Sequence, residues 1–201
     1  MFRSSFTLIA LSLVVAVQGC GGGAGGPVDQ RSGIDVRPFV GKYGFCENNE
    51  LTTRLVTFIS EAEVAIKFTS DFYQNADCTG AVVASETPYE INASFQRDMG
   101  SISVVNLQNT GNLFLRVYEV ALLPKQRYSI NLSGSGVYVD AQGRTCIRFS
   151  ATSNRCYSAD SYPDIIEVQR VVGYISFDNN IFYGIKIKNG AYDVFEAYPK
   201  I

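Results

Sequence analysis

The fold class of this chain is decided by the stretch EVAIKFTSDFY at residues 63–73. One side of this segment is apolar if the chain is extended, and it consists of Val64, Ile66, Phe68 and Phe72. The other side is polar and consists of Glu63, Lys67, Thr69 and Asp71. A period of two residues is typical of a β-strand that buries one face, so the stretch predicts a strand with its apolar side toward a core.

The same alternation recurs further along the chain, near residues 128–132 and 181–187. In the second of these runs we expect one buried face made of Ile181, Tyr183, Ile185 and Ile187. Turn-forming residues separate the runs at short intervals, and Asn189-Gly190 is a strong hairpin signal between two alternating segments. We predict strands near residues 38–46, 52–60, 63–73, 81–94, 101–107, 112–123, 127–132, 135–139, 144–150, 171–177, 181–187 and 191–199.

Two segments fit this scheme less directly. Residues 113–123 also have a helical spacing of apolar positions, although we favour a strand there. Residues 159–170 contain Pro163, and we expect a loop with one helical turn. Many consecutive hairpins leave exposed sheet edges unless a barrel or a sandwich removes them. The pattern predicts an all-β protein with one antiparallel sheet of roughly seven to ten strands that curls and closes as a barrel.

The composition excludes several functional classes. The 201 residues contain 17 Lys and Arg against 19 Asp and Glu, with no His and no Trp. This balance provides no cationic surface for a nucleic acid. Without His, the chain has no Ser-His-Asp triad, no papain-like thiol pair, no His-ligated zinc and no histidine pH switch. The length suits one domain.

The N-terminal region has the features of an export signal. Arg3 precedes an apolar run from Phe6 to Val17, which is shorter than the ~20 residues that span a bilayer. The following Val17-Gln18-Gly19-Cys20 resembles the lipobox of bacterial lipoproteins. That resemblance implies a signal peptide at residues 1–19, a lipidated Cys20 and a lipid anchor in the membrane. Gly21, in place of Asp, implies the outer membrane of a Gram-negative bacterium.

A Gly-rich tether over residues 20–33 then leads to a single domain at residues 34–201. With Cys20 assigned to acylation, four of the five cysteines remain for this domain. An exported chain folds under oxidising conditions, so we expect two disulfides. We favour Cys146 with Cys156, because the polar residues 150–154 between them suit a hairpin, and hence Cys46 with Cys78. No Cys-x-x-Cys spacing supports a zinc site, and we expect no metal.

A second resemblance covers most of the mature region. Phe39-Val40-Gly41-Lys42-Tyr43 is similar to the Gly-x-Trp element of lipocalin-type barrels, with Tyr43 in the Trp position. Later runs look like those of small secreted bacterial lipoproteins with lipocalin-like barrels, at residues 68–73, 77–80, 179–184 and 197–200. Members of that group mostly lack an assigned activity. The resemblance therefore implies a fold without implying a reaction.

Motifs for catalysis are not evident in the sequence. Gly134-Ser135-Gly136 does not complete a nucleophile elbow, and Gly41-Lys42 is not a phosphate loop. We interpret Arg144, Arg148 and Arg155 as surface charges around the disulfide hairpin, with recognition of an anion as the alternative. Tyrosines at a barrel mouth suit an amphipathic ligand, and the four candidates are Tyr43, Tyr73, Tyr183 and Tyr198.

The leading hypothesis is a monomeric, non-catalytic envelope lipoprotein that uses no cofactor and binds a small apolar ligand or an envelope partner. One alternative is a structural or surface-interaction protein whose barrel is filled by its own side chains. A second alternative is a glycan hydrolase that uses two of the 19 acidic residues.

Overall fold

The computed structural model describes residues 33–106, 110–158 and 164–201. Helical structure in these ranges is limited to the 3-10 turn η1 (Arg37–Phe39). The strands are β1 (Gly41–Glu47), β2 (Glu50–Ser60), β3 (Glu63–Tyr73), β4 (Val82–Glu86), β5 (Tyr89–Val105), β6 (Asn112–Pro124), β7 (Tyr128–Ile130), β8 (Leu132–Ser133), β9 (Val137–Val139), β10 (Thr145–Arg148), β11 (Asn154–Tyr157), β12 (Asp164–Ile166), β13 (Val171–Asp178), β14 (Ile181–Lys188) and β15 (Ala191–Pro199). Within the described ranges, no helix has the length and apolarity needed to cross a membrane.

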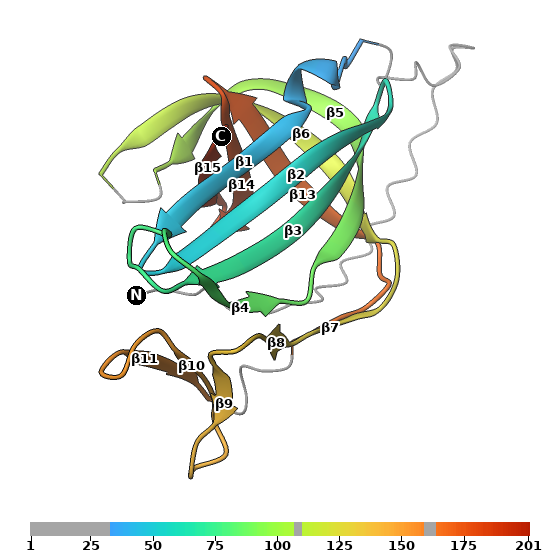
Figure 1. Cartoon of the computed structure of the whole chain (residues 1–201). Coiled ribbons are helices and arrows are strands. Elements are labelled where there is room, and N and C mark those ends of the chain that lie inside the picture. The colour runs from blue at the N-terminus through green and yellow to red at the C-terminus, as the bar shows by residue number, and fades with distance from the viewer. Residues whose placement is uncertain (1–32, 107–109, 159–163) are drawn as a thin grey trace, which may run out of the picture.

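Most strands belong to one strongly curved sheet, here called the main sheet (Figure 1). Antiparallel pairs join β1 to β2, β2 to β3, β3 to β5 and β5 to β6, and then β6 to β13, β13 to β14 and β14 to β15. A parallel contact between β5 and β15 is limited to Val105 and Asp193. The last strand also meets the first, because Tyr43 forms a bridge with Lys200 and the Ile201 amide donates to the Lys42 carbonyl at 2.9 Å.

The all-β prediction is confirmed, and several elements lie where the sequence indicates. β3 covers residues 63–73, and its apolar side is buried at Val64, Ile66 and Phe72. Residues 113–123 are a strand, within β6. Asn189 and Gly190 join β14 to β15 with φ angles of 52° and 79°. This left-handed pair matches a two-residue hairpin turn whose twist suits the flanking strands.

The predicted division of residues 81–107 is wrong. β4 ends at Glu86, and a new strand begins after Pro88, which has no amide proton to donate to a sheet. β5 then continues without a break to Val105. Parts of the two strands expected at 81–94 and 101–107 therefore belong to this single strand. Register shifts between Phe95 and Arg97 and between Asp98 and Ser101 allow the strand to bend and remain paired.

The predicted buried face of residues 181–187 is confirmed only in part. Tyr183 and Ile185 pack together in a second core, whereas Ile187 is exposed. Phe182, on the other side of β14, packs in the largest core, so both sides of this strand are covered. The register shift between Gly184 and Ile185 leaves Phe195 of the neighbouring strand β15 as the extra residue of a bulge. The second core lies between β14, β15 and the distal parts of β5 and β6, and its buried members are Val104, Leu115, Val117, Ile185 and Val194.

The helical turn expected within residues 159–170 is not formed in the described part of that segment. Residues 164–166 form β12, which pairs antiparallel with β7. Residues 159–163 lie outside the described residues. The pairing with β7 supplies backbone hydrogen-bond partners that a local sequence pattern does not reveal.

The largest core is aromatic and lies inside the curve of the main sheet. Phe39 of η1 stacks on Phe177 with ring centroids 4.4 Å apart, and it also contacts Phe95 and Tyr118 at 5.7 and 5.3 Å. Residues 34–39 thus contribute buried side chains that pack against the strands. Offset and tilted aromatic pairs of this kind add to the stability that burial provides. We call the whole core, including its aliphatic members such as Val56 and Ile66, the aromatic core.

A small sheet, β9–β11, lies below the main sheet in Figure 1. It packs against β3 and β4 through a small cluster of buried residues, Phe72, Ala84, Ile147, Phe149 and Tyr157. Cys146 and Cys156 are opposite one another in its β10–β11 pair and form a disulfide with a Cα–Cα distance of 4.0 Å. The disulfide between Cys46 and Cys78, at 6.0 Å, joins the end of β1 to the segment after β3. Both predicted pairings are confirmed.

Candidate functional site

A buried ion pair lies within the curve of the main sheet. The Arg54 Nη2 atom donates to Glu196 Oε2 at 2.8 Å and to the Tyr198 hydroxyl at 3.1 Å. The side chains of Arg54 and Glu196 are only 11% and 14% exposed. Arg54 Nη1 donates to its neighbouring Thr53 carbonyl at 3.1 Å. A charge pair this deeply buried loses its hydration. The surrounding residues must therefore provide good geometry and further hydrogen bonds to offset that loss.

Two aromatic rings lie against the Arg54 guanidinium. Its central carbon lies 4.4 Å from the centroid of Phe68 and 4.6 Å from that of Tyr198. Tyr89 continues the stack, because its ring is nearly parallel to Phe68 at 4.5 Å. Cation–π contacts favour such a planar cation between rings, especially where water is excluded. We call Arg54, Glu196, Tyr198, Phe68 and Tyr89 the Arg54 cluster.

The cluster changes the protonation equilibria of its members. Burial is the largest influence and lowers the pKa of Arg54, but the charge and hydrogen bond of Glu196, together with Tyr198 and Tyr89, outweigh it, and the net pKa lies above its usual value. Burial, assisted by the Glu196 charge, raises the pKa of the Tyr198 hydroxyl well above its usual value. Arg54 therefore remains a cation and Tyr198 remains a neutral phenol. The Arg54 cluster presents hydrogen-bond donors in an apolar setting.

One donor of the cluster has no partner. Arg54 Nε is buried and makes no hydrogen bond, whereas both Nη atoms do. A buried N–H without an acceptor costs roughly 1–3 kcal/mol, so a binding partner at this atom would be stabilising. Gly184 contributes to the arrangement, because a Cβ at that position would overlap the side chain of Glu196.

The sequence contains a weak signal for this site. Val56 of β2 faces the aromatic core, and Arg54 lies two residues earlier on the same side of the strand. A charged residue on the inward side of an alternating strand is uncommon unless it is paired. Glu196 alternates with Tyr198 on β15, and both side chains contact Arg54. Neither residue was among the sequence candidates.

The four candidate tyrosines do not lie together. Tyr198 belongs to the Arg54 cluster and also contacts the ring of Phe182. Tyr43 contacts Phe182 as well, with ring centroids 6.2 Å apart. Tyr43 is 2% exposed, and its hydroxyl donates to the Phe39 carbonyl at 2.8 Å. Tyr183 packs against the second core, and Tyr73 ends β3, where its amide donates to the Asn49 carbonyl.

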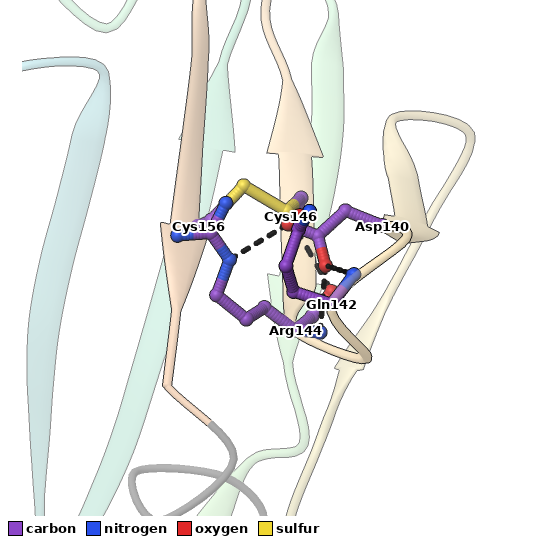
Figure 2. Close-up of polar contacts among 5 residues, drawn as sticks. All are labelled: Asp140, Gln142, Arg144, Cys146 and Cys156. Atoms are coloured by element: carbon purple, nitrogen blue, oxygen red, sulfur yellow. Dashed lines mark hydrogen bonds and ion pairs between the residues drawn. A yellow bond between two sulfur atoms is a disulfide. The ribbon is translucent and has the colours of Figure 1, made fainter.

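The turn between β9 and β10 is the second polar group of note (Figure 2). Asp140 Oδ1 accepts the amides of Gln142 and Arg144 at 3.0 and 2.9 Å, and its Oδ2 accepts Arg144 Nε at 2.7 Å. These bonds from Arg144 and Gln142 lower the pKa of Asp140. Asp140 lies near the sulfurs of Cys146 and Cys156, but these are bonded to each other and are not available as thiolate ligands. We interpret this group as a braced turn.

The three arginines near the disulfide hairpin each contact a different partner. Arg144 pairs with Asp140, and Arg148 lies over the ring of Tyr138 at 4.8 Å. Arg155 pairs with Glu50 at 3.0 Å and donates to the Asn48 carbonyl, which links the small sheet to the β1–β2 turn. They do not form one anion-binding group.

The predicted signal peptide at residues 1–19, the lipidated Cys20 and the tether at residues 20–33 lie outside the described residues, apart from Gly33. Comparisons of the chain with protein-family models, with curated proteins and with solved structures find no match.

Proposed function

We propose that this chain is a non-catalytic lipoprotein of the bacterial outer membrane, anchored through Cys20, whose mature part is a lipocalin-like β-barrel that binds a small ligand. The expected ligand is mostly apolar and carries a neutral hydrogen-bond acceptor, such as a carbonyl oxygen, that receives the Arg54 Nε proton. The buried, unpartnered Nε atom is the observation that carries this proposal.

The strand pairing supports the barrel. Pairs lead from β1 through β2, β3 and β5 to β6, and from there through β13 and β14 to β15. The Tyr43–Lys200 bridge then returns the path to β1, and Lys200 Nζ donates to the Val40 carbonyl at 2.9 Å beside it. A circuit of this kind leaves the main path without a long free edge, which is what a barrel achieves.

The charge balance of the Arg54 cluster defines the class of ligand. Arg54 is already neutralised by Glu196, so an anionic ligand would leave one negative charge without compensation in a buried place. A neutral acceptor avoids that cost and still satisfies Nε. The rings of Phe68, Tyr89 and Tyr198 make the surroundings of this donor apolar.

The acidic residues whose pKa is shifted have the opposite shift to that of a catalytic acid. A glycan hydrolase needs a carboxylic acid whose pKa is raised. The carboxylates with shifted pKa values among the described residues are Asp35, Asp77, Asp98 and Asp140, and hydrogen bonds lower the pKa of each. Glu50 and Glu196 have mostly buried side chains, and each is paired with an arginine.

A structural role is the second candidate, and the aromatic core favours it. Phe39, Phe95, Tyr118 and Phe177 fill the space inside one end of the main sheet by contacting one another. If side chains fill the whole interior in this way, the ion pair only helps to specify the fold. The two candidates differ in whether the purified protein carries a ligand.

Native mass spectrometry of the mature lipidated protein, purified from envelopes in mild detergent, tests the binding role. We expect a bound small molecule in the wild type and its loss from the double variant Arg54→Met with Glu196→Met. The double variant is a suitable control for folding, because replacing both members of a buried pair with apolar residues is often neutral for stability. A wild type without a bound molecule, or a double variant that retains it, would favour the structural role.

A separate experiment tests the anchor. Labelled palmitate should enter the wild type, and the Cys20→Ser variant should not incorporate it and should leave the membrane fraction. Membrane binding that persists in Cys20→Ser without the label would contradict the lipoprotein assignment.

A further inference from the structure

Two large apolar side chains are exposed together where β2 meets β3. Phe58 is 47% exposed and Ile59 is 43% exposed. The register of the β2–β3 pair shifts between Phe58 and Ser60, so Ile59 is the extra residue of a bulge. Bulges redirect side chains that a regular strand would place on opposite faces. We call Phe58 and Ile59 the β2–β3 tip.

The chain enters the domain beside this tip. The Val36 amide donates to the Glu61 carbonyl at 3.3 Å, which attaches the entering segment to the β2–β3 turn. Figure 1 shows the start of the described chain and the β2–β3 turn at the same end of the molecule. Residues 20–33, which follow the lipobox-like sequence, are rich in glycine. Whatever its conformation, a segment of this length reaches no further than about 50 Å.

We propose that the β2–β3 tip inserts into the interfacial layer of the phospholipid bilayer that holds the lipid anchor. This inference rests on the proposed acylation of Cys20. Two side chains do not hold a protein on a membrane by themselves, but the acyl chains supply the attachment, and the limited length of the connecting segment keeps the domain near the surface. The tip then determines which end of the domain faces the bilayer.

The charges near the tip indicate how it binds. Charged groups near the tip include Glu61 and Glu63 of the β2–β3 turn, together with Asp35 and Arg37, which pair with one another. These residues form no basic surface that would attract anionic lipids. Insertion is therefore driven by burial of apolar side chains, and it should depend weakly on salt and on the fraction of anionic lipid.

The absence of tryptophan from the chain allows a direct measurement. The variant Phe58→Trp places a single fluorophore in the tip, Ile59→Trp places one at the adjacent position, and Phe114→Trp serves as the matched control. Phe114 is 76% exposed and lies near the start of β6. The turn end of the β5–β6 pair lies on the opposite side of the molecule from the β2–β3 turn in Figure 1.

Each full-length lipidated variant is reconstituted into vesicles of phosphatidylethanolamine and phosphatidylglycerol, some with brominated acyl chains. We expect every variant to float with the vesicles, and tryptophan in the tip to be quenched at least about two-fold more than tryptophan at position 114. This difference should persist in high salt.

Equal quenching at the three positions, with normal flotation, would overturn the proposal for the tip and leave the anchor in place. Loss of flotation would overturn the anchor and the tip together. Blue-shifted emission from the tip positions of the Cys20→Ser protein in buffer without detergent or lipid, unchanged by vesicles, would indicate a protein contact and would also overturn the proposal.

Discussion

The main sheet and the small sheet β9–β11 achieve stability in different ways. The main sheet encloses a large aromatic core, and it tolerates a buried ion pair between Arg54 and Glu196 beside that core. The small sheet buries few residues and is held by the Cys146–Cys156 disulfide, by the Asp140 turn and by the link from Arg155 to Glu50. The comparison indicates that apolar burial stabilises the main sheet enough for it to contain a buried polar site. The small sheet is stabilised by a disulfide and by local polar bonds.

The largest expected effect concerns the buried ion pair. The single variant Arg54→Met leaves Glu196 buried without a partner and should lower the free energy of unfolding by about 3–5 kcal/mol. The control is Arg116→Met, which removes an ion pair with Asp98 whose arginine is 62% exposed and should cost at most about 1 kcal/mol. Urea unfolding measures both. Equal costs would show that the Arg54 pair behaves like a surface pair.

The next effect distinguishes the small sheet from the main sheet. Replacing both Cys146 and Cys156 with serine opens a loop with a sequence separation of 10 residues and should cost about 2–3 kcal/mol in the chain-entropy view. Hydrogen exchange should accelerate in β9–β11 while β2 and β3 keep their protection. A uniform loss of protection would mean that the two sheets unfold as one unit.

A smaller effect is expected at the glycine beside the ion pair. Gly184→Ala places a methyl group against the Glu196 side chain, which Arg54 holds in place, and should destabilise the protein by about 1–2 kcal/mol. The same substitution made in the Arg54→Met, Glu196→Met background should cost less, because the side chain at position 196 is then free to move. Thermal unfolding of the four proteins provides the double-mutant cycle. Additive costs would exclude the coupling.

The smallest effect is the acid response of the Asp140 turn. Hydrogen bonds lower the pKa of Asp140 in the folded state, so its stabilising effect is present above the unfolded-state pKa and is lost as the pH falls through the folded value. Asp140→Asn should therefore be slightly less stable than the wild type near neutral pH, and the two should converge between about pH 5 and pH 2. Hydrogen exchange of β9 and β10 follows this change. A difference that is constant with pH would argue against a role for the carboxylate charge.

Local sequence signals predicted the elements that depend on neighbouring residues. The Asn189-Gly190 turn, the β3 strand and the Cys146–Cys156 hairpin each follow from nearby residues. Bulges are different, because they depend on pairing with another strand. For that reason the continuity of β5 and the bulge of β15 opposite Gly184 were not predicted.

The candidate site was harder to predict than the fold. Arg54 and Glu196 are separated by 142 residues, and they become neighbours only when the last strand returns to the first. Their inward positions are recognisable once the register of each strand is known. Of the predicted tyrosines, Tyr198 alone belongs to the Arg54 cluster, since its alternation with Glu196 places both side chains beside Arg54.

The most direct test of the ligand-binding proposal is the NMR signal of the Arg54 side-chain Nε–H group, assigned through an Arg54→Lys variant. In the protein stripped of any bound molecule, we expect this proton to exchange far more slowly than that of exposed Arg116, and its resonance to move when a lipid extract of the envelope is added. An Arg54 proton that exchanges as rapidly as that of Arg116, or a resonance that no extract component moves, would contradict the proposal that Arg54 binds a ligand.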